Sequence, residues 1–311
     1  MLWIRKHRPY SIGIDMGDDS VKLVQLEAKD KVVGLVYGGS KRRPADIKAG
    51  TVEWQRWAIE AIREIIANGK FKGREVMATM PASEVFVEVM KMPKSKELKV
   101  EQAILSKIKS KLPVLPENTM LKYIPTEEDN VIVLATEREK IDRHLAIYEK
   151  ASLQIKSIGV WPTTLTNTYA SFFGRRKSDL ESVVFLIDTE SNCTNVVISR
   201  HKNLLFVRSI PIGKKQFGDE NMITRLNLEL AACKRQFNSM YRKATIERLI
   251  FLSGQAVDKE VCMGIAKQLE IPAQIGDCLA AVEIKDPLES GIERRGCDFS
   301  WAIAFGLSLT R

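Results

Sequence analysis

The chain has 311 residues, of which 45% are hydrophobic and 28% are charged. A length of this order predicts about two domains or one large two-lobed unit, and the charged fraction excludes disordered and collagen-like chains. Lysine and arginine total 48 against 39 acidic residues, which leaves a net charge of +9. This moderate excess favours solubility and leaves open an acidic partner, a nucleic acid or an anionic membrane surface.

Cysteine and histidine are too scattered to indicate a metal site. The five cysteines include no Cys-x-x-Cys pair, and the three histidines lie far apart, with His144 in a polar helical stretch that needs no role. A disulfide framework and a zinc ribbon are therefore not expected. No apolar stretch approaches the ~20 residues that cross a bilayer, and the N-terminus lacks the apolar core of a signal peptide. We expect a reduced, soluble, cytosolic protein.

Apolar periodicity predicts two units in the first part of the chain. The first unit comprises two strands within 10–36 around a Gly17-Asp18-Asp19 turn, a helix at 51–67 and a strand at 75–80. The second, smaller unit comprises a strand at 85–90, a helix at 96–111, strands at Tyr123 and 131–135, and a helix at 137–151. A helix at 163–173 then leads into the charged segment 174–181, which we take as the boundary between two halves.

The second half opens as the first does. Its predicted strands lie at 183–187, 196–199, 204–207 and 249–252. The last of these ends in a Ser253-Gly254-Gln255 turn that leads into a helix, and an apolar helix with Gly306 inside it closes the chain. Small residues in that helix predict tight packing under the hairpins.

One face of the 96–111 helix and its approach is rich in lysine: Lys91, Lys94, Lys96, Lys99, Lys107, Lys109 and Lys111. Because no aromatic residue or arginine is interleaved with them, single-strand nucleic-acid binding is not favoured. We interpret the run as a solvated helix face, with a docking surface for acidic protein or anionic lipid as the alternative.

Two segments half a chain apart share one pattern: IGIDMGDDSVKLVQL (12–26) and FLIDTESNCTNVVIS (185–199). Each is an apolar strand, one aspartate, a short polar turn and a returning strand. Backbone N–H groups in two such turns can point at phosphate oxygens, and Asp15 and Asp188 can hold a hydrated Mg²⁺. The Ser253-Gly254 turn suits a backbone that approaches a nucleotide closely, although an ordinary strand-to-helix turn explains it equally well.

The order of these elements resembles the actin–Hsp70–sugar kinase superfamily, and more narrowly the PilM family of type IV pilus assembly proteins, relatives of FtsA. The narrower resemblance covers nearly the whole chain. It rests on residues 12–26, MPASEVFVEVMKMPKSKEL (80–98), VRSIPIG (207–213) and AFGLSL near the C-terminus. No amphipathic tail or transmembrane helix follows the final helix, which favours PilM over FtsA and the related type II secretion protein.

The resemblance implies a two-lobed actin-like (ribonuclease H-like) α/β fold with a small α+β subdomain inserted in the first lobe. The implied divisions are 1–83 with 151–175 for the first lobe, 84–150 for the insert, and 182–311 for the second lobe, which has a helical portion near 217–246. The implied function is a cytoplasmic adaptor, peripheral to the inner membrane through its partners. It would bind ATP and Mg²⁺, grip the N-terminal cytoplasmic tail of a PilN-like bitopic membrane protein, contact other pilus assembly proteins, and bind no nucleic acid.

By position in the family pattern, the implied nucleotide-binding residues are Asp15, Gly17, Ser20, Lys22, Asp188, Thr189, Gly213, Lys234, Ser253 and Gly254. Asp15 and Asp188 are the implied Mg²⁺ ligands. The tail is expected at the junction of the first lobe and the insert, where a small inserted sheet exposes a strand edge that a peptide can extend.

Three places depart from the family pattern: Asp18-Asp19 where relatives favour Ser or Gly, Glu190 where Gly is usual, and Gln255 where a second Gly is common. A carboxylate close to a triphosphate repels it. We therefore expect at most slow ATP hydrolysis and keep a nucleotide-free scaffold of the same complex as the alternative. A sugar-kinase-like phosphotransferase is a weaker alternative, because the altered turns argue against it.

Overall fold

The computed structural model describes residues 8–29, 32–93, 100–112, 115–286, 289–292 and 299–310. The first of its three sheets has the strand order β1-β3-β2-β5-β9, with β4 paired to β3. These strands are β1 (Arg8–Pro9), β2 (Ile12–Met16), β3 (Ser20–Lys29), β4 (Val32–Arg42), β5 (Glu75–Thr79) and β9 (Gln154–Gly159). Strands β2, β3 and β4 are antiparallel, whereas β2, β5 and β9 are parallel.

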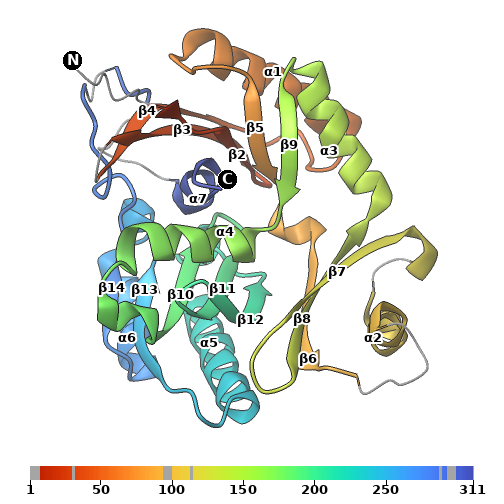
Figure 1. Cartoon of the computed structure of the whole chain (residues 1–311), viewed down its shortest axis with the longest axis vertical. Helices are drawn as coiled ribbons and strands as arrows, with labels where there is room; N and C mark the ends of the chain where they lie inside the picture. The colour runs from red at the N-terminus through yellow and green to blue at the C-terminus, as the bar shows by residue number, and fades with distance from the viewer. Residues whose placement is uncertain are drawn as a thin grey trace, which may run out of the picture.

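Two helices cover the outer face of this sheet, α1 (Val52–Asn68) and α3 (Arg138–Lys150) (Figure 1). Helix α1 begins where the Thr51 hydroxyl accepts a hydrogen bond from the Trp54 N–H at 3.3 Å, a standard N-cap. Its apolar stripe is buried against the sheet, as the spacing predicts: Trp54, Trp57, Ala58, Ala61, Ile62, Ile65 and Ile66.

The second sheet has the order β12-β11-β10-β13-β14. Its strands are β10 (Val183–Thr189), β11 (Thr194–Arg200), β12 (Asn203–Ile210), β13 (Ile246–Phe251) and β14 (Ala273–Ile275). Every residue of β10 is buried because helices lie on both faces of the sheet. Helices α5 (Glu220–Met240) and α6 (Lys259–Leu269) lie on the outer side (Figure 1).

Two helices fill the space between the sheets, α4 (Trp161–Thr168) and α7 (Ala302–Ser308) (Figure 1). Helix α7 packs on β2, and a Cβ on Gly13 would lie 2.2 Å from the Ala304 carbonyl oxygen. It also packs on α4, where a Cβ on Gly306 would lie 2.3 Å from the Thr164 carbonyl oxygen. Both glycines are therefore required by the close approach of backbones, and the expected tight packing of the closing helix is confirmed.

The third sheet is small and has the order β6-β8-β7, formed by β6 (Phe86–Lys91), β8 (Asn130–Glu137) and β7 (Thr119–Pro125). Helix α2 (Val100–Ile108) packs on it through Ile104 and Ile108, which meet Val131 and Val133 in a separate small core. Of the lysine-rich run, Lys94, Lys96 and Lys99 lie outside the described residues. The predicted domain boundaries stay predictions.

The predicted elements and the structure agree except in a few places. Residues 10–36 contain parts of three strands rather than two, because β3 runs to Lys29 and β4 begins at Val32. The strands β9 and β14 were not expected, because each is short and has no buried residue. No helix within the described ranges combines the length and apolarity needed to span a membrane.

Candidate functional site

The two predicted hairpins lie on opposite sides of a cleft between the two large sheets. Asp15 faces Lys22 across β2 and β3, and Asp188 faces Asn195 across β10 and β11, so the two aspartates occupy equivalent positions. Both are buried, with exposed fractions of 2% and 0%. The sequence echo therefore corresponds to a structural one.

Lys22 lies at the bottom of this cleft. Its ammonium Nζ is 2.6 Å from Oδ2 of Asp15 and donates a hydrogen bond to the Ser300 carbonyl oxygen at 2.8 Å. Burial alone would lower the pKa of Lys22, but the carboxyl groups of Asp15, Glu190 and Asp188 raise it above its ordinary value. Lys22 is therefore charged and held by the protein itself.

The second aspartate is held by hydroxyl groups. Oδ1 of Asp188 accepts hydrogen bonds from the Ser300 hydroxyl and, at 3.4 Å, from the Ser253 hydroxyl. The Thr189 N–H donates to Oγ of Ser253 at 2.6 Å, so the predicted Ser253 turn does lie beside the second hairpin. Burial and the Asp15 carboxylate raise the pKa of Asp188. Its Oδ2 has no hydrogen-bond partner among the described residues.

Glu190 crosses the cleft toward the first turn. Its Oε2 lies 3.6 Å from the position that a Cβ on Gly17 would occupy. Burial raises the pKa of Glu190 to about 8, the carboxyl groups of Asp15, Asp188 and Asp19 add to that shift, and Lys22 opposes it. This carboxyl group therefore takes up a proton more readily than an exposed glutamate does.

The remaining predicted residues divide into two groups. Ser20 and Thr189 line the same small space as Lys22. A Cβ on Gly213 would lie 2.5 Å from the backbone nitrogens of Asn192 and Cys193, so this glycine permits close packing against the second turn. Lys234 lies apart, since its ammonium donates at 2.5 Å to the Leu269 carbonyl at the end of α6 and it lines neither space of the cleft.

The cleft contains two separate spaces. The first, of about 10 Å³, lies between the turns and is lined by Asp19, Ser20, Lys22, Thr189, Glu190, Ser191, Lys214, Phe299 and Ser300. The second, of about 140 Å³, adjoins the Ser253-Gly254 turn and is also lined by Gln255, Leu252, Asp277, Cys278, Leu279, Ala280, Phe299 and Trp301. Gly254 has a φ of +58°, a left-handed conformation that favours glycine.

ATP and Mg²⁺, which an actin-like fold implies, do not fit these side-chain positions. The space between the turns has room for about one water molecule, whereas small-molecule sites have volumes of roughly 300–1,000 Å³. Lys22 already pairs with Asp15, the first predicted Mg²⁺ ligand.

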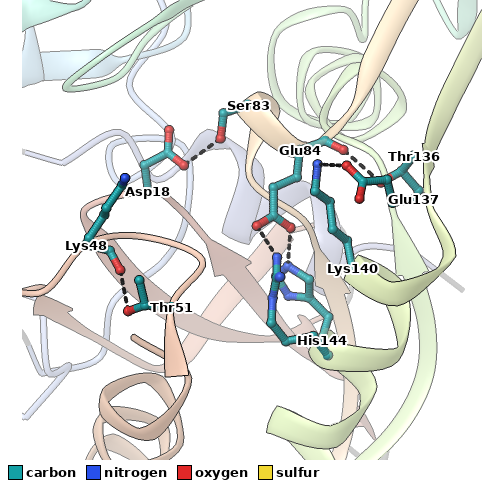
Figure 2. A network of polar contacts seen from close by, with 10 residues as sticks. Asp18, Lys48, Thr51, Ser83, Glu84, Thr136, Glu137, Lys140 and His144 are labelled. Carbon is teal, nitrogen blue, oxygen red and sulfur yellow. Dashed lines mark hydrogen bonds and ion pairs between the residues drawn. The ribbon is translucent and has the colours of Figure 1, made fainter. Parts of the chain in front are cut away.

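A polar network connects the first turn to the small third sheet. Figure 2 shows the short helical turn at 82–84 with contacts on both sides: the Ser83 hydroxyl donates to Asp18 at 2.7 Å, and Glu84 contacts His144 on α3 at 2.9 Å. Arg143 adds an ion pair with Glu84 at 2.5 Å. His144 is fully buried although it lies in a helical stretch whose sequence is polar.

A cavity of about 550 Å³ lies beside this turn and is lined by Met80 and Val85, which flank it in the chain. Two sheet edges line it, since β9 ends the order of the first sheet and β7 ends that of the third. Most of its remaining wall is apolar: Met80, Val85, Leu134, Ile141, Leu145 and Val160. It is an apolar groove bordered by two terminal strands, at the junction where the sequence predicts that a peptide can extend an exposed strand edge.

Two lobes with matching hairpins around a cleft define an actin-like ATPase fold, and the comparisons agree. A PilM-PilN type IV pilus biogenesis complex structure matches with a TM-score of 0.78 and 18% identity, covering 96% of this chain and 98% of that one. A Bacteroides thetaiotaomicron protein with an actin-like ATPase fold and unknown function matches with a TM-score of 0.52, at 13% identity, over 91% and 96% of the two chains. The cytoplasmic domain of EpsL, an inner-membrane component of the Vibrio cholerae type II secretion system, also has a TM-score of 0.52, at 11% identity, over 98% and 96%.

The sequence also matches the model of a protein family. The model of the type IV pilus assembly protein PilM family matches residues 13–237, which is more than half of the chain. The chain belongs to this family, and the predicted family and fold class are confirmed. No curated protein is significantly similar to it in sequence.

Proposed function

We propose that this protein is an adaptor of a type IV pilus assembly complex and docks the cytoplasmic tail of a PilN-like membrane protein. It would act in the cytoplasm and reach the inner membrane through that partner and other assembly proteins. Membership of the PilM family and the fold match to a PilM-PilN complex support this proposal. The observation that carries it is the apolar groove between β7 and β9.

The groove suits an extended peptide for two physical reasons. The outer edges of β7 and β9 offer backbone N–H and C=O groups, which a peptide can pair with as an added strand. Apolar side chains along the wall, including Leu121, Ile155 and Ile158, can bury alternate side chains of that peptide. The predicted ATP and Mg²⁺ play no part in this docking.

The test uses a fluorescent synthetic peptide with the sequence of the N-terminal tail of the PilN-like protein from the same cell. Met120 on β7 lines the groove and is 37% exposed, so Met120→Glu changes the groove with little cost to folding. We expect fluorescence anisotropy to show saturable binding to the native protein and about tenfold weaker binding to the variant, because a charge replaces an apolar contact.

Met263→Glu is the matched control, since Met263 is 63% exposed on α6, in the other lobe. It is expected to bind the peptide as the native protein does. Equal affinity of the native protein and Met120→Glu would refute this location of the docking site, and absence of binding by the native protein would refute the docking function.

A further inference from the structure

Three carboxylates in the two turns depart from the family pattern: Asp18, Asp19 and Glu190. All three contact other residues of the chain. Asp18 accepts a hydrogen bond from the Ser83 hydroxyl, which directs it away from the cleft and toward the turn at 82–84. Asp19 and Glu190 act across the cleft. Asp18 therefore lies outside the space between the turns, whereas Asp19 and Glu190 line it.

Asp19 joins the first turn to the second lobe. Its carboxylate is 3.5 Å from the Lys215 ammonium and accepts a hydrogen bond from the Ser191 side chain. Burial would raise the pKa of Asp19, but that hydrogen bond and the ammonium groups of Lys215 and Lys22 lower it overall. Asp19 is thus ionised and bonded to the opposite lobe.

Glu190 makes the reciprocal connection. It extends from the second turn to the backbone of Gly17 in the first, and it is one of three acidic side chains around the Lys22 ammonium. Lys22 in turn bonds to Ser300, at the start of the segment that leads into α7. The positive charge at the centre of the cleft and the acidic group beside Gly17 both belong to the chain.

We propose that these five side chains, Asp15, Lys22, Asp19, Glu190 and Lys215, form a cross-cleft lock that closes the two lobes on each other in place of Mg-ATP. In this lock the Lys22 ammonium takes the position of a divalent cation between the aspartates, and the Glu190 carboxyl takes the position of a phosphate beside Gly17. The space of about 10 Å³ that remains admits one water molecule but no triphosphate. The adaptor is therefore held closed without nucleotide.

The test is a calorimetric titration of the full chain with Mg-ATP. We expect no saturable heat from the native protein at millimolar nucleotide. Glu190→Gly removes the group beside Gly17 and is expected to gain saturable binding of Mg-ATP. The heat released on titration should be at least tenfold above that of the native protein. Glu190→Gln fills the same volume, so it is expected to stay closed like the native protein.

Two results would overturn the proposal. One is saturable Mg-ATP binding by the native protein that Asp15→Ala abolishes, which would show a working nucleotide site. The other is a Glu190→Gly protein with native circular dichroism and a cooperative melt that gains no binding. If that variant does not fold, the titration of the native protein still decides, because the lock permits no saturable binding. The peptide assay on the groove is independent of either outcome.

Discussion

The two hairpins that face each other across the cleft have the same backbone pattern and bind their aspartates in different ways. In the first, Asp15 is paired across the strands with the ammonium of Lys22. In the second, the equivalent partner is Asn195, and Asp188 is bound instead by the hydroxyls of Ser253 and Ser300.

The difference shows that one repeated motif can accommodate its buried aspartate in two ways. A buried carboxylate requires either a cation or a proton. The first hairpin supplies a cation, and the second raises the pKa of its aspartate. Both features come from the chain's own residues. The groove beside β7 and β9 differs from the cleft. The cleft aspartates are bound by groups of the chain itself, whereas the outer edges of these strands pair with no other strand among the described residues.

The largest effect is expected from Lys22→Met, which breaks the pair in the first hairpin. The substitution keeps the length of the side chain but leaves the buried Asp15 carboxylate without its cation. Removing one member of a buried pair costs about 3–5 kcal/mol of unfolding free energy. Urea unfolding followed by circular dichroism measures this loss.

Asn195→Ala is the matched change in the second hairpin. Its side-chain oxygen accepts a hydrogen bond from the Ser209 hydroxyl at 2.9 Å, and losing one neutral hydrogen bond costs about 1 kcal/mol. Equal losses from the two variants would contradict the distinction between the hairpins.

A pH-dependent effect is expected from Glu190. Its pKa is raised to about 8 in the folded state, so between its ordinary pKa and pH 8 the folded protein retains a proton that the unfolded chain releases. Stability from this group is complete below the ordinary pKa and is lost as the pH rises toward 8. We expect the Tm of the native protein to fall across this range and the Tm of Glu190→Gln to fall less. Parallel pH profiles from differential scanning calorimetry would exclude this role for Glu190.

Much of the fold could be predicted from local pattern. The alternation around Asp15 and Asp188, the apolar stripe of α1 and the small residues of α7 all follow from the period of a strand or a helix. Strands β9 and β14 could not be predicted, because they are short edge strands with no buried residue and their pairing depends on distant partners.

The candidate site could also be predicted only in part, because some of its contacts join distant segments. The sequence predicts that both aspartates lie at a cleft, but Lys22 bonds to Ser300, which is 278 residues away. His144 has polar neighbours in sequence, and only the packing of α3 against Glu84 and Trp54 shows that it is buried. Pairings between distant segments decide which polar residues face solvent and which face each other, and no local period encodes them.

The smallest effect is expected from Asp188→Asn, which tests the second hairpin directly. If Asp188 is protonated in the folded protein, an amide of the same size can still accept the hydrogen bonds from Ser253 and Ser300 through its oxygen. The expected loss of unfolding free energy is then about 1 kcal/mol or less. The same change at Asp15 leaves the Lys22 ammonium buried without its partner, so Asp15→Asn is expected to lose several times as much. Urea unfolding of both variants at pH 7 compares the two aspartates. A loss at Asp188 as large as that at Asp15 would mean that both hairpins carry a buried negative charge, and the lock would then lack the balance that closes the cleft.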